Sequence, residues 1–195
     1  MDRVKFNAKC KAIRDKHLKK IDAEYARRNP KPMATMRQPI AHSRSACESV
    51  ALLSTAAVLR LYFDGSCNPN PGGTPHFGWY ITGDDGELVA SEVGSVDGLS
   101  DEAKTNNTAE WAGLLGGIRW LRDHAGAIDT LEIYGDSRLV ISQYKGAFRC
   151  KKPHLKWYCD QCRDLTNKLD VGHVEAKWIS REQNQWADEL SKFRN

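Results

Sequence analysis

The stretch "YFDGSCNPNPGG" at residues 62–73 decides how the folded part of this chain is interpreted. An apolar run ends on one carboxylate, Asp64, and a loop of small polar residues, two prolines and three glycines follows it. Either the acid is an ordinary exit from a strand into a turn, or it holds a ligand that needs the backbone close by. Glycines fit the second explanation, because they allow a close approach of the backbone to a ligand.

The pattern outside this stretch predicts one α/β domain. Alternating apolar residues predict strands, and apolar residues three and four positions apart predict helices. The order β-β-β-α-β-α-α-β-α predicts a five-stranded mixed sheet, with three antiparallel and two parallel strands, flanked by helices. The predicted strands cover residues 57–66, 77–83, 88–96, 130–137 and 173–180, and the predicted helices cover residues 106–126, 138–146, 154–168 and 182–193.

Charge divides the chain into two parts. Of the 29 basic and 25 acidic residues, 13 and 5 lie within residues 1–50, which leaves 16 and 20 for the rest. Apolar residues recur at helical spacing through residues 1–29, which predicts a basic amphipathic helical extension before a linker at 30–56 and a domain at 57–195. This basic arm is either a solubilising tail or a nonspecific tether for a polyanion such as nucleic acid.

Composition narrows the class of protein. No run approaches the roughly 18 consecutive apolar residues of a membrane span, and we expect a soluble monomer. The chain has six cysteines and no apolar signal core at its start, which favours reduced thiols in a cytoplasmic protein. The pair in "CDQC" at 159–162 has no second pair to complete a zinc site, so we interpret it as structural.

Two acids stand at the ends of predicted strands. Asp64 is in register with Arg60 and Tyr62, while Asp136 ends the fourth strand in register with Tyr134. If the first and fourth strands are parallel neighbours, both acids lie side by side at the carboxyl edge of the sheet. Open α/β sheets bind their ligands at that edge.

Two further acids lie on inward faces of helices. Glu110 shares a stripe with Leu114 and Ile118, although acids are also favoured at helix N-termini by the backbone dipole. Asp188 lies beside Ala187 in the closing helix. Each acid alone has an ordinary structural explanation, but four carboxylates at one sheet edge repel one another unless a cation neutralises them. Oxygen ligands favour Mg²⁺ or Mn²⁺ over zinc.

Four motifs in this order resemble type 1 ribonuclease H: "DGSCNPNPGG", "TNNTAE", "YGDS" and "NQWADELS". The resemblance covers residues 57–194 and implies a ribonuclease H-like fold. It implies that Asp64, Glu110, Asp136 and Asp188 are catalytic and bind two Mg²⁺ ions, with Mn²⁺ as a substitute. The implied activity is endonuclease hydrolysis of the RNA strand of RNA–DNA hybrids, which leaves 3′-hydroxyl and 5′-phosphate ends.

The resemblance also implies contacts with the hybrid. Amide and hydroxyl side chains can both donate and accept hydrogen bonds in a minor groove that displays 2′-hydroxyls. Helix capping is the alternative for the "TNN" run. The residues implied to bind substrate are Gly65, Ser66, Asn70, Thr105, Asn106, Asn107, Arg138, Lys151 and Lys152. We expect Trp79 and Trp178 to belong to the sheet core rather than to stack on bases.

The chain departs from the family pattern in three places. The loop "WISREQNQWAD" lacks the histidine that many members carry, and either Arg181 or Glu182 could take its place. Arg138 stands where many relatives have an amide, which favours a phosphate contact over a base contact. A short basic segment, "KGAFRCKKPHLKW", replaces a longer basic protrusion and is either a hybrid contact or a solvated loop. Two alternatives to a hybrid-cleaving enzyme stay open: a hybrid-binding module that is weakly active or inactive, and another nuclease or polynucleotidyl transferase of the same fold.

Overall fold

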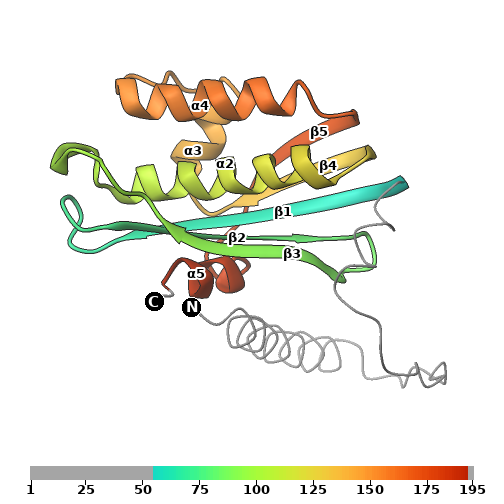
Figure 1. Cartoon of the computed structure of the whole chain (residues 1–195), viewed down its shortest axis with the longest axis horizontal. Coiled ribbons are helices and arrows are strands. Elements are labelled where there is room, and N and C mark those ends of the chain that lie inside the picture. Colours follow the sequence, from blue (N-terminus) through green and yellow to red (C-terminus); the bar gives the residue numbers. More distant parts are fainter. Residues whose placement is uncertain (1–54, 193–195) are drawn as a thin grey trace. The chain divides into compact units, whose positions relative to one another are not determined.

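The computed structural model describes residues 55–192, and side chains from residue 58 onward. The predicted extension at 1–29 and all but the last two residues of the predicted linker lie outside the described residues. Figure 1 shows the order of the elements along the chain. They are β1 (Thr55–Cys67), β2 (Pro75–Thr82), β3 (Leu88–Ser95), the 3₁₀ helix η2 (Asp101–Ala103), α2 (Asn106–His124), β4 (Ala127–Gly135), α3 (Arg138–Tyr144), α4 (Pro153–Thr166), β5 (Val171–Trp178) and α5 (Gln185–Ser191).

The five strands form one mixed sheet in the order β3-β2-β1-β4-β5, which confirms the predicted fold class. The pairs β1–β2 and β2–β3 are antiparallel, whereas β1–β4 and β4–β5 are parallel. The turn between β2 and β3 contains Gly86 at a φ of 80°, a left-handed conformation that glycine adopts without a steric penalty. None of the helices in the described part combines the length and apolar composition that a membrane span requires.

Helices cover the two faces of the sheet unequally. Figure 1 shows α2, α3 and α4 on one side of the sheet and the short α5 on the other. The alternation of β1 places Leu59, Leu61 and Phe63 toward α2, where all three are fully buried. Arg60 and Tyr62 point to the α5 side and stay partly exposed. Asp64 has the same parity, so its side chain starts from the face on which α5 lies.

The first strand ends at Cys67, one residue after the end of its predicted range, although Asp64 itself was predicted to end it. Its parallel pairing with β4 ends at Phe63 and Gly135, whereas its antiparallel pairing with β2 continues to Cys67. Asp64 therefore does not end the strand, contrary to the prediction. It lies at the point where β4 leaves the sheet, because the chain of β4 turns into α3. Asp136 follows Gly135 directly, so both acids lie at this branch point.

The "CDQC" pair belongs to the core, as its sequence context predicts. Cys159 and Cys162 are buried in α4 within the main hydrophobic cluster, and both are free thiols. Burial raises the pKa of each thiol, which disfavours the thiolate that metal binding and redox chemistry require.

Gly65 allows the closest approach between the sheet and α2. A Cβ atom at this position would lie 2.1 Å from the backbone nitrogen of Glu110 and 2.3 Å from the carbonyl carbon of Ala109. No real Cβ atom fits at such distances, and backbone atoms cannot move aside as a side chain can. The packing of α2 therefore requires a glycine here. This is a different reason from the substrate approach inferred from the sequence.

We predict that Gly65→Ala lowers the free energy of unfolding by about 1–3 kcal/mol or more, because the added methyl group overpacks the contact with α2. Urea unfolding followed by circular dichroism measures the change. Gly83→Ala is the matched control, since its Cβ would meet only the Asp85 side chain, at 3.0 Å. Equal stability of the two variants would contradict this account of Gly65.

Candidate functional site

Three of the predicted acids converge at the branch point of the sheet. Asp64 comes from β1, Glu110 from the fifth residue of α2, and Asp136 from the residue after β4. One carboxylate oxygen of each lies within 4.8 Å of the others. Among the described residues this is the group of acids, histidines or cysteines with the geometry to hold a metal ion. Residues 72 positions apart are thus brought into one cluster.

The cluster is buried, which makes its negative charge costly. Asp64 is 4% exposed and Glu110 is 8% exposed. Burial raises the pKa of Asp64 to about 7, and the nearby charges of Asp136 and Asp188 add to the effect. Burial also raises the pKa of Glu110 well above its usual range, with further contributions from Asp64 and Asp136. Without a cation, these carboxyls must share protons to reduce their repulsion.

The residues present fit a divalent cation. Glu110 Oε2 is buried and has no hydrogen-bond partner in the part of the chain that the structure describes. Such an oxygen costs free energy unless something binds it. The donor set consists of carboxylate oxygens, which hard cations such as Mg²⁺ and Mn²⁺ prefer. An orphaned oxygen within a compact acidic cluster therefore supports the expectation of a metal centre.

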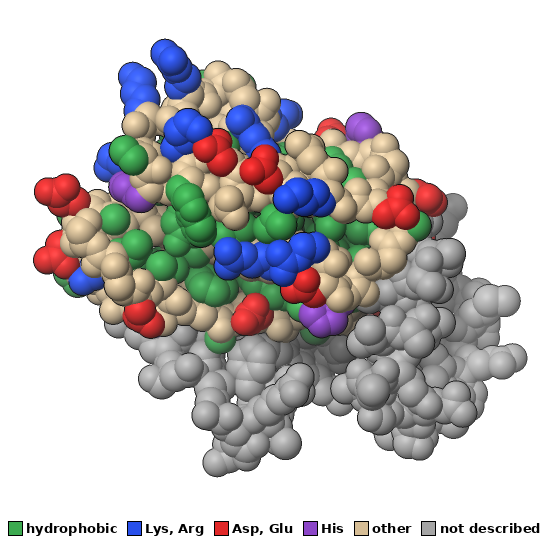
Figure 2. All heavy atoms as spheres, turned by 45° about the horizontal axis from the view of Figure 1, so that its top comes forward, with side chains coloured by type: hydrophobic (Ala, Val, Ile, Leu, Met, Phe, Trp, Pro, Cys, Tyr) green, Lys and Arg blue, Asp and Glu red, His purple; other side chains and the backbone are tan. Residues whose placement is uncertain are grey.

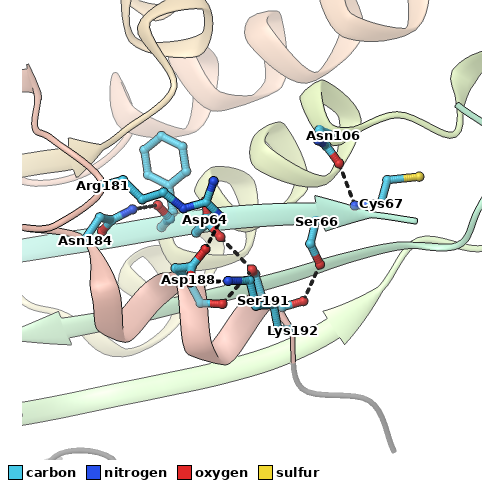
Figure 3. Close-up of polar contacts among 10 residues, drawn as sticks. Asp64, Ser66, Cys67, Asn106, Arg181, Asn184, Asp188, Ser191 and Lys192 are labelled. Atoms are coloured by element: carbon cyan, nitrogen blue, oxygen red, sulfur yellow. Dashed lines mark hydrogen bonds and ion pairs between the residues drawn. The ribbon is translucent and has the colours of Figure 1, made fainter. Parts of the chain in front are cut away.

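Asp188, the fourth predicted acid, lies beside this cluster and not within it. Its side chain is 13% exposed and forms ion pairs with Arg181 and with Lys192, the latter at 2.5 Å. Figure 3 shows Asp188 on α5 close to Asp64, with the guanidinium of Arg181 nearby. It is near enough for its charge to contribute to the raised pKa of Asp64. The structure thus brings three acids together and holds the fourth between two cationic groups.

The loop that lacks a histidine directs Arg181 toward the acids. Arg181 Nη2 donates to Asp188 Oδ1, and this hydrogen bond raises the pKa of Arg181. The negative charges of Asp64 and Asp136 raise that pKa further. Glu182 is exposed and interacts with Ser180 of its own loop. Of the two candidates for the missing histidine, the structure places Arg181 at the acidic site.

Ser191 is a site residue that sequence reasoning missed. Its hydroxyl donates to Asp64 Oδ2 at 2.5 Å, and the residue is fully buried. A serine in the last turn of a helix carries no functional pattern. The available signal was its position three residues after Asp188, which puts both on one side of the helix.

The predicted hybrid-contacting amides hold the site together. Asn70 Oδ1 accepts from the backbone nitrogen of Asn106, and Asn106 Oδ1 accepts from that of Cys67 at 2.6 Å. Thr105 is the N-cap of α2 and accepts from the backbone nitrogen of Thr108, while its contact with the hybrid stays a prediction. Asn107 lies half-buried in the same turn. Ser66 donates to the backbone oxygen of Ser191 at 2.6 Å.

The prediction that Trp178 belongs to the core is wrong, whereas Trp79 is buried as predicted. Trp178 is 42% exposed, since it ends the edge strand β5 where no helix covers it. Its Nε1 donates to the backbone oxygen of Asp136 at 2.9 Å. The guanidinium carbon of Arg138 lies 4.3 Å from the ring centroid, a cation–π contact. An exposed indole thus supports both Asp136 and Arg138.

The short basic segment lies on the surface at the start of α4. Lys151 and Lys152 are exposed just before Pro153, the first residue of that helix. Phe148 and Trp157, at 55% and 50% exposure, are large apolar side chains of the same region. Figure 2 shows basic side chains gathered in the upper part of the view above an apolar area. These basic and aromatic residues lie in α4 and just before it, whereas the acidic cluster comes from β1, α2 and the residue after β4.

The raised pKa of Asp64 predicts an unusual dependence of stability on pH when metal is removed. A carboxyl whose pKa is about 7 when folded and 3.8 when unfolded stabilises the fold below the lower value. That contribution, on the order of a few kcal/mol, is lost as the pH rises through the higher value. In EDTA, the free energy of unfolding should therefore fall between about pH 4 and about pH 7 and level off above that range.

Urea unfolding across that pH range measures the effect. Asp64→Asn should be the more stable form at the upper end and should show a weaker pH dependence, because its side chain has no charge to bury. Magnesium should restore the wild-type protein at the upper end. A wild-type stability that rises with pH in EDTA would contradict the proposed burial cost.

Comparisons with known proteins agree with this geometry. The family model described as reverse transcriptase-like matches residues 62–194. Ribonuclease HI of Halobacterium salinarum is 33% identical over 130 residues, which are 67% of this chain and 60% of that protein. YpeP of Bacillus subtilis is 35% identical over 89 residues, which are 46% of this chain and 39% of that protein. The chain thus spans less than two thirds of the length of these two curated relatives.

Solved structures show the same relationship. The crystal structure of RNase H1 from Halobacterium salinarum NRC-1 is 31% identical, with a TM-score of 0.59 over 69% of this chain and 94% of that one. LC11-RNase H1, solved in complex with an RNA/DNA hybrid, is 27% identical with a TM-score of 0.59 over 68% of this chain and 92% of that one. The family model matches most of the described residues, and the alignment with the Halobacterium RNase H1 covers 94% of that structure at 31% identity. This chain therefore belongs to the type 1 ribonuclease H family.

Proposed function

We propose that this protein is a metal-dependent endoribonuclease that hydrolyses the RNA strand of RNA–DNA hybrids. The observation that carries the proposal is the convergence of Asp64, Glu110 and Asp136 in a buried cluster with an orphaned carboxylate oxygen. The substrate class is suggested by LC11-RNase H1, a relative that was crystallised with an RNA/DNA hybrid. The proposed products carry 3′-hydroxyl and 5′-phosphate ends.

Asp64, Glu110 and Asp136 would hold the cations, two Mg²⁺ ions in this proposal with Mn²⁺ as a substitute. Bound divalent cations supply activation of the attacking water and stabilisation of the leaving oxygen. Asp188 is the proposed fourth ligand, and it forms ion pairs with Arg181 and Lys192, which offset its charge. The chain itself contributes the rigid placement of the carboxylates, since a small misplacement of reacting groups lowers rates strongly.

Substrate binding would use the polar and basic groups around the cluster. Asn70, Asn106 and Asn107 lie on the loop and the first turn that border Glu110. Arg138, whose guanidinium carbon lies 4.3 Å from the centroid of the Trp178 ring, presents a planar guanidinium suited to a phosphate. Lys151 and Lys152 would add phosphate contacts further from the cluster. The free thiols of the described cysteines are consistent with the cytoplasmic, monomeric protein that we propose.

Cleavage of a defined set of substrates tests the proposal. We expect loss of the RNA strand of a labelled hybrid in Mg²⁺, none in EDTA, and no cleavage of duplex DNA or single strands. Asp136→Asn should abolish cleavage while hybrid binding in Ca²⁺ stays close to wild type, because the variant loses a metal ligand and no grip on the substrate. Asp160→Asn removes an acid from the exposed side of α4 and should stay fully active.

A protein that binds the hybrid but cleaves it under no metal would instead be a hybrid-binding module. Cleavage of duplex DNA at a comparable rate would indicate another nuclease of the same fold. Both outcomes would overturn the proposal, and separate measurements of binding and cleavage distinguish them.

We also propose that residues 1–50 tether nucleic acid without sequence preference, because they carry 13 basic and 5 acidic residues. Deletion of this segment should weaken hybrid binding and flatten the dependence of the dissociation constant on salt, since fewer phosphate counterions are released. Titrations at several salt concentrations measure the slope for both forms. An unchanged slope would rule out the tether.

A further inference from the structure

Three hydrogen bonds connect the segment of α5 to the end of β1 that carries Asp64. Asn184 Nδ2 donates to the backbone oxygen of Phe63 at 2.8 Å, and Ser66 Oγ donates to the backbone oxygen of Ser191 at 2.6 Å. Between these two contacts, Ser191 Oγ donates to Asp64 Oδ2 at 2.5 Å. Figure 3 shows this arrangement, with Ser191 directed toward Asp64 and Asn184 on the far side. The first two bonds fix the helix, and the third reaches the carboxylate itself.

The hydroxyl proton of Ser191 goes to Asp64. A serine hydroxyl has one proton to donate, and Ser191 Oγ lies near two acceptors. The backbone oxygen of Asp188 is 3.0 Å away, whereas the carboxylate oxygen of Asp64 is 2.5 Å away. Hydrogen bonds to a carboxylate are shorter and stronger than those to a neutral acceptor. Ser191 is fully buried, so no water competes for the proton.

The hydrogen bond from Ser191 restrains the Asp64 carboxylate, which neighbouring negative charges repel. Asp64 shares its site with Glu110 and Asp136, whose charges repel it. Holding Oδ2 fixes the plane of the carboxylate and therefore the direction of Oδ1. A carboxylate oxygen also keeps a second lone pair after it accepts one hydrogen bond, so the bond does not exclude a cation.

We propose that Ser191 is a positioning residue that orients the Asp64 carboxylate for cation binding. The inference rests on the proposed metal centre and adds a residue that closes the motif "NQWADELS", to which the sequence analysis assigned no role. Ser191 acts through Asp64 and does not touch the substrate. Because α5 also carries Asp188, the same helix that supplies the last acid of the site orients the first one.

Mn²⁺ binding tests the proposal without requiring cleavage. Isothermal titration calorimetry or electron paramagnetic resonance of added Mn²⁺ gives the affinity of each protein. We expect Ser191→Ala to weaken Mn²⁺ binding by about tenfold or more, the usual effect of removing a partner of a metal ligand. Ser191→Cys, with a weaker donor of similar size, should lie between Ser191→Ala and wild type. In cleavage assays, the Mg²⁺ concentration for half-maximal rate should rise while KM for the hybrid stays unchanged.

Thr166→Val is the matched control for the loss of a buried hydroxyl. Thr166 is buried in α4, and its hydroxyl contacts Tyr144 and the backbone oxygen of Cys162, away from the acids. This variant should lose stability yet bind Mn²⁺ as wild type does. The proposal is overturned if Ser191→Ala binds Mn²⁺ like wild type, if Thr166→Val weakens binding equally, or if the wild-type protein binds no Mn²⁺.

The failure of this inference and the failure of the proposed function have different signatures. A wild-type protein that cleaves hybrids while Ser191→Ala keeps its Mn²⁺ affinity would refute the positioning role alone. A wild-type protein that binds Mn²⁺ but cleaves no hybrid would refute the proposed activity, and a weakened Ser191→Ala would still support the positioning role.

Discussion

Repulsion among buried carboxylates is the constraint on which this structure depends. Asp64, Glu110 and Asp136 present oxygens within 4.8 Å of one another, and two of them are almost completely buried. Such a cluster costs free energy in the absence of a counter-charge, as the raised pKa of Asp64 shows. The packing of the rest of the domain must therefore contribute enough stability to offset the repulsion among these acids. A divalent cation converts this cost into affinity for the metal.

The frame that meets this demand is built from both faces of the sheet. On one face, α2 approaches β1 so closely at Gly65 that no side chain fits, which places Glu110 over the branch point. On the other face, α5 is bound to the same strand through Asn184, Ser66 and Ser191. The two helices thus fix Asp64 from opposite directions. A site of this kind tolerates little motion, since catalysis by positioning depends on distances that a loose element would not maintain.

Several groups at the rim of the site lie where the chain departs from the family pattern. Arg181 stands in the loop without a histidine and pairs with Asp188, while Trp178 supports the backbone of Asp136 and holds Arg138 against its ring. A planar guanidinium that stacks on an indole is more restricted in its orientation than the ammonium group of a lysine. Arg138 thus lies against Trp178 close to Asp136 in sequence, while Lys151 and Lys152 are exposed at the start of α4.

The sequence by itself determined the order of the strands and α-helices, the mixed sheet and the three acids of the cluster, because alternation, helical spacing and short motifs are local signals. Local signals also explain the buried stripe of α2 below Glu110 and the cap at Thr105. Only the tertiary structure decided that β1 pairs with β2 but not with β4 at Asp64, that Trp178 is exposed at an edge, and that Ser191 reaches Asp64. Each of these depends on which segment lies beside another in space: β2 extends the pairing, the sheet ends at β5, and α5 packs 127 residues away in sequence from the acid that it holds. The pattern of residues along the chain does not show which distant segments become neighbours in the folded protein.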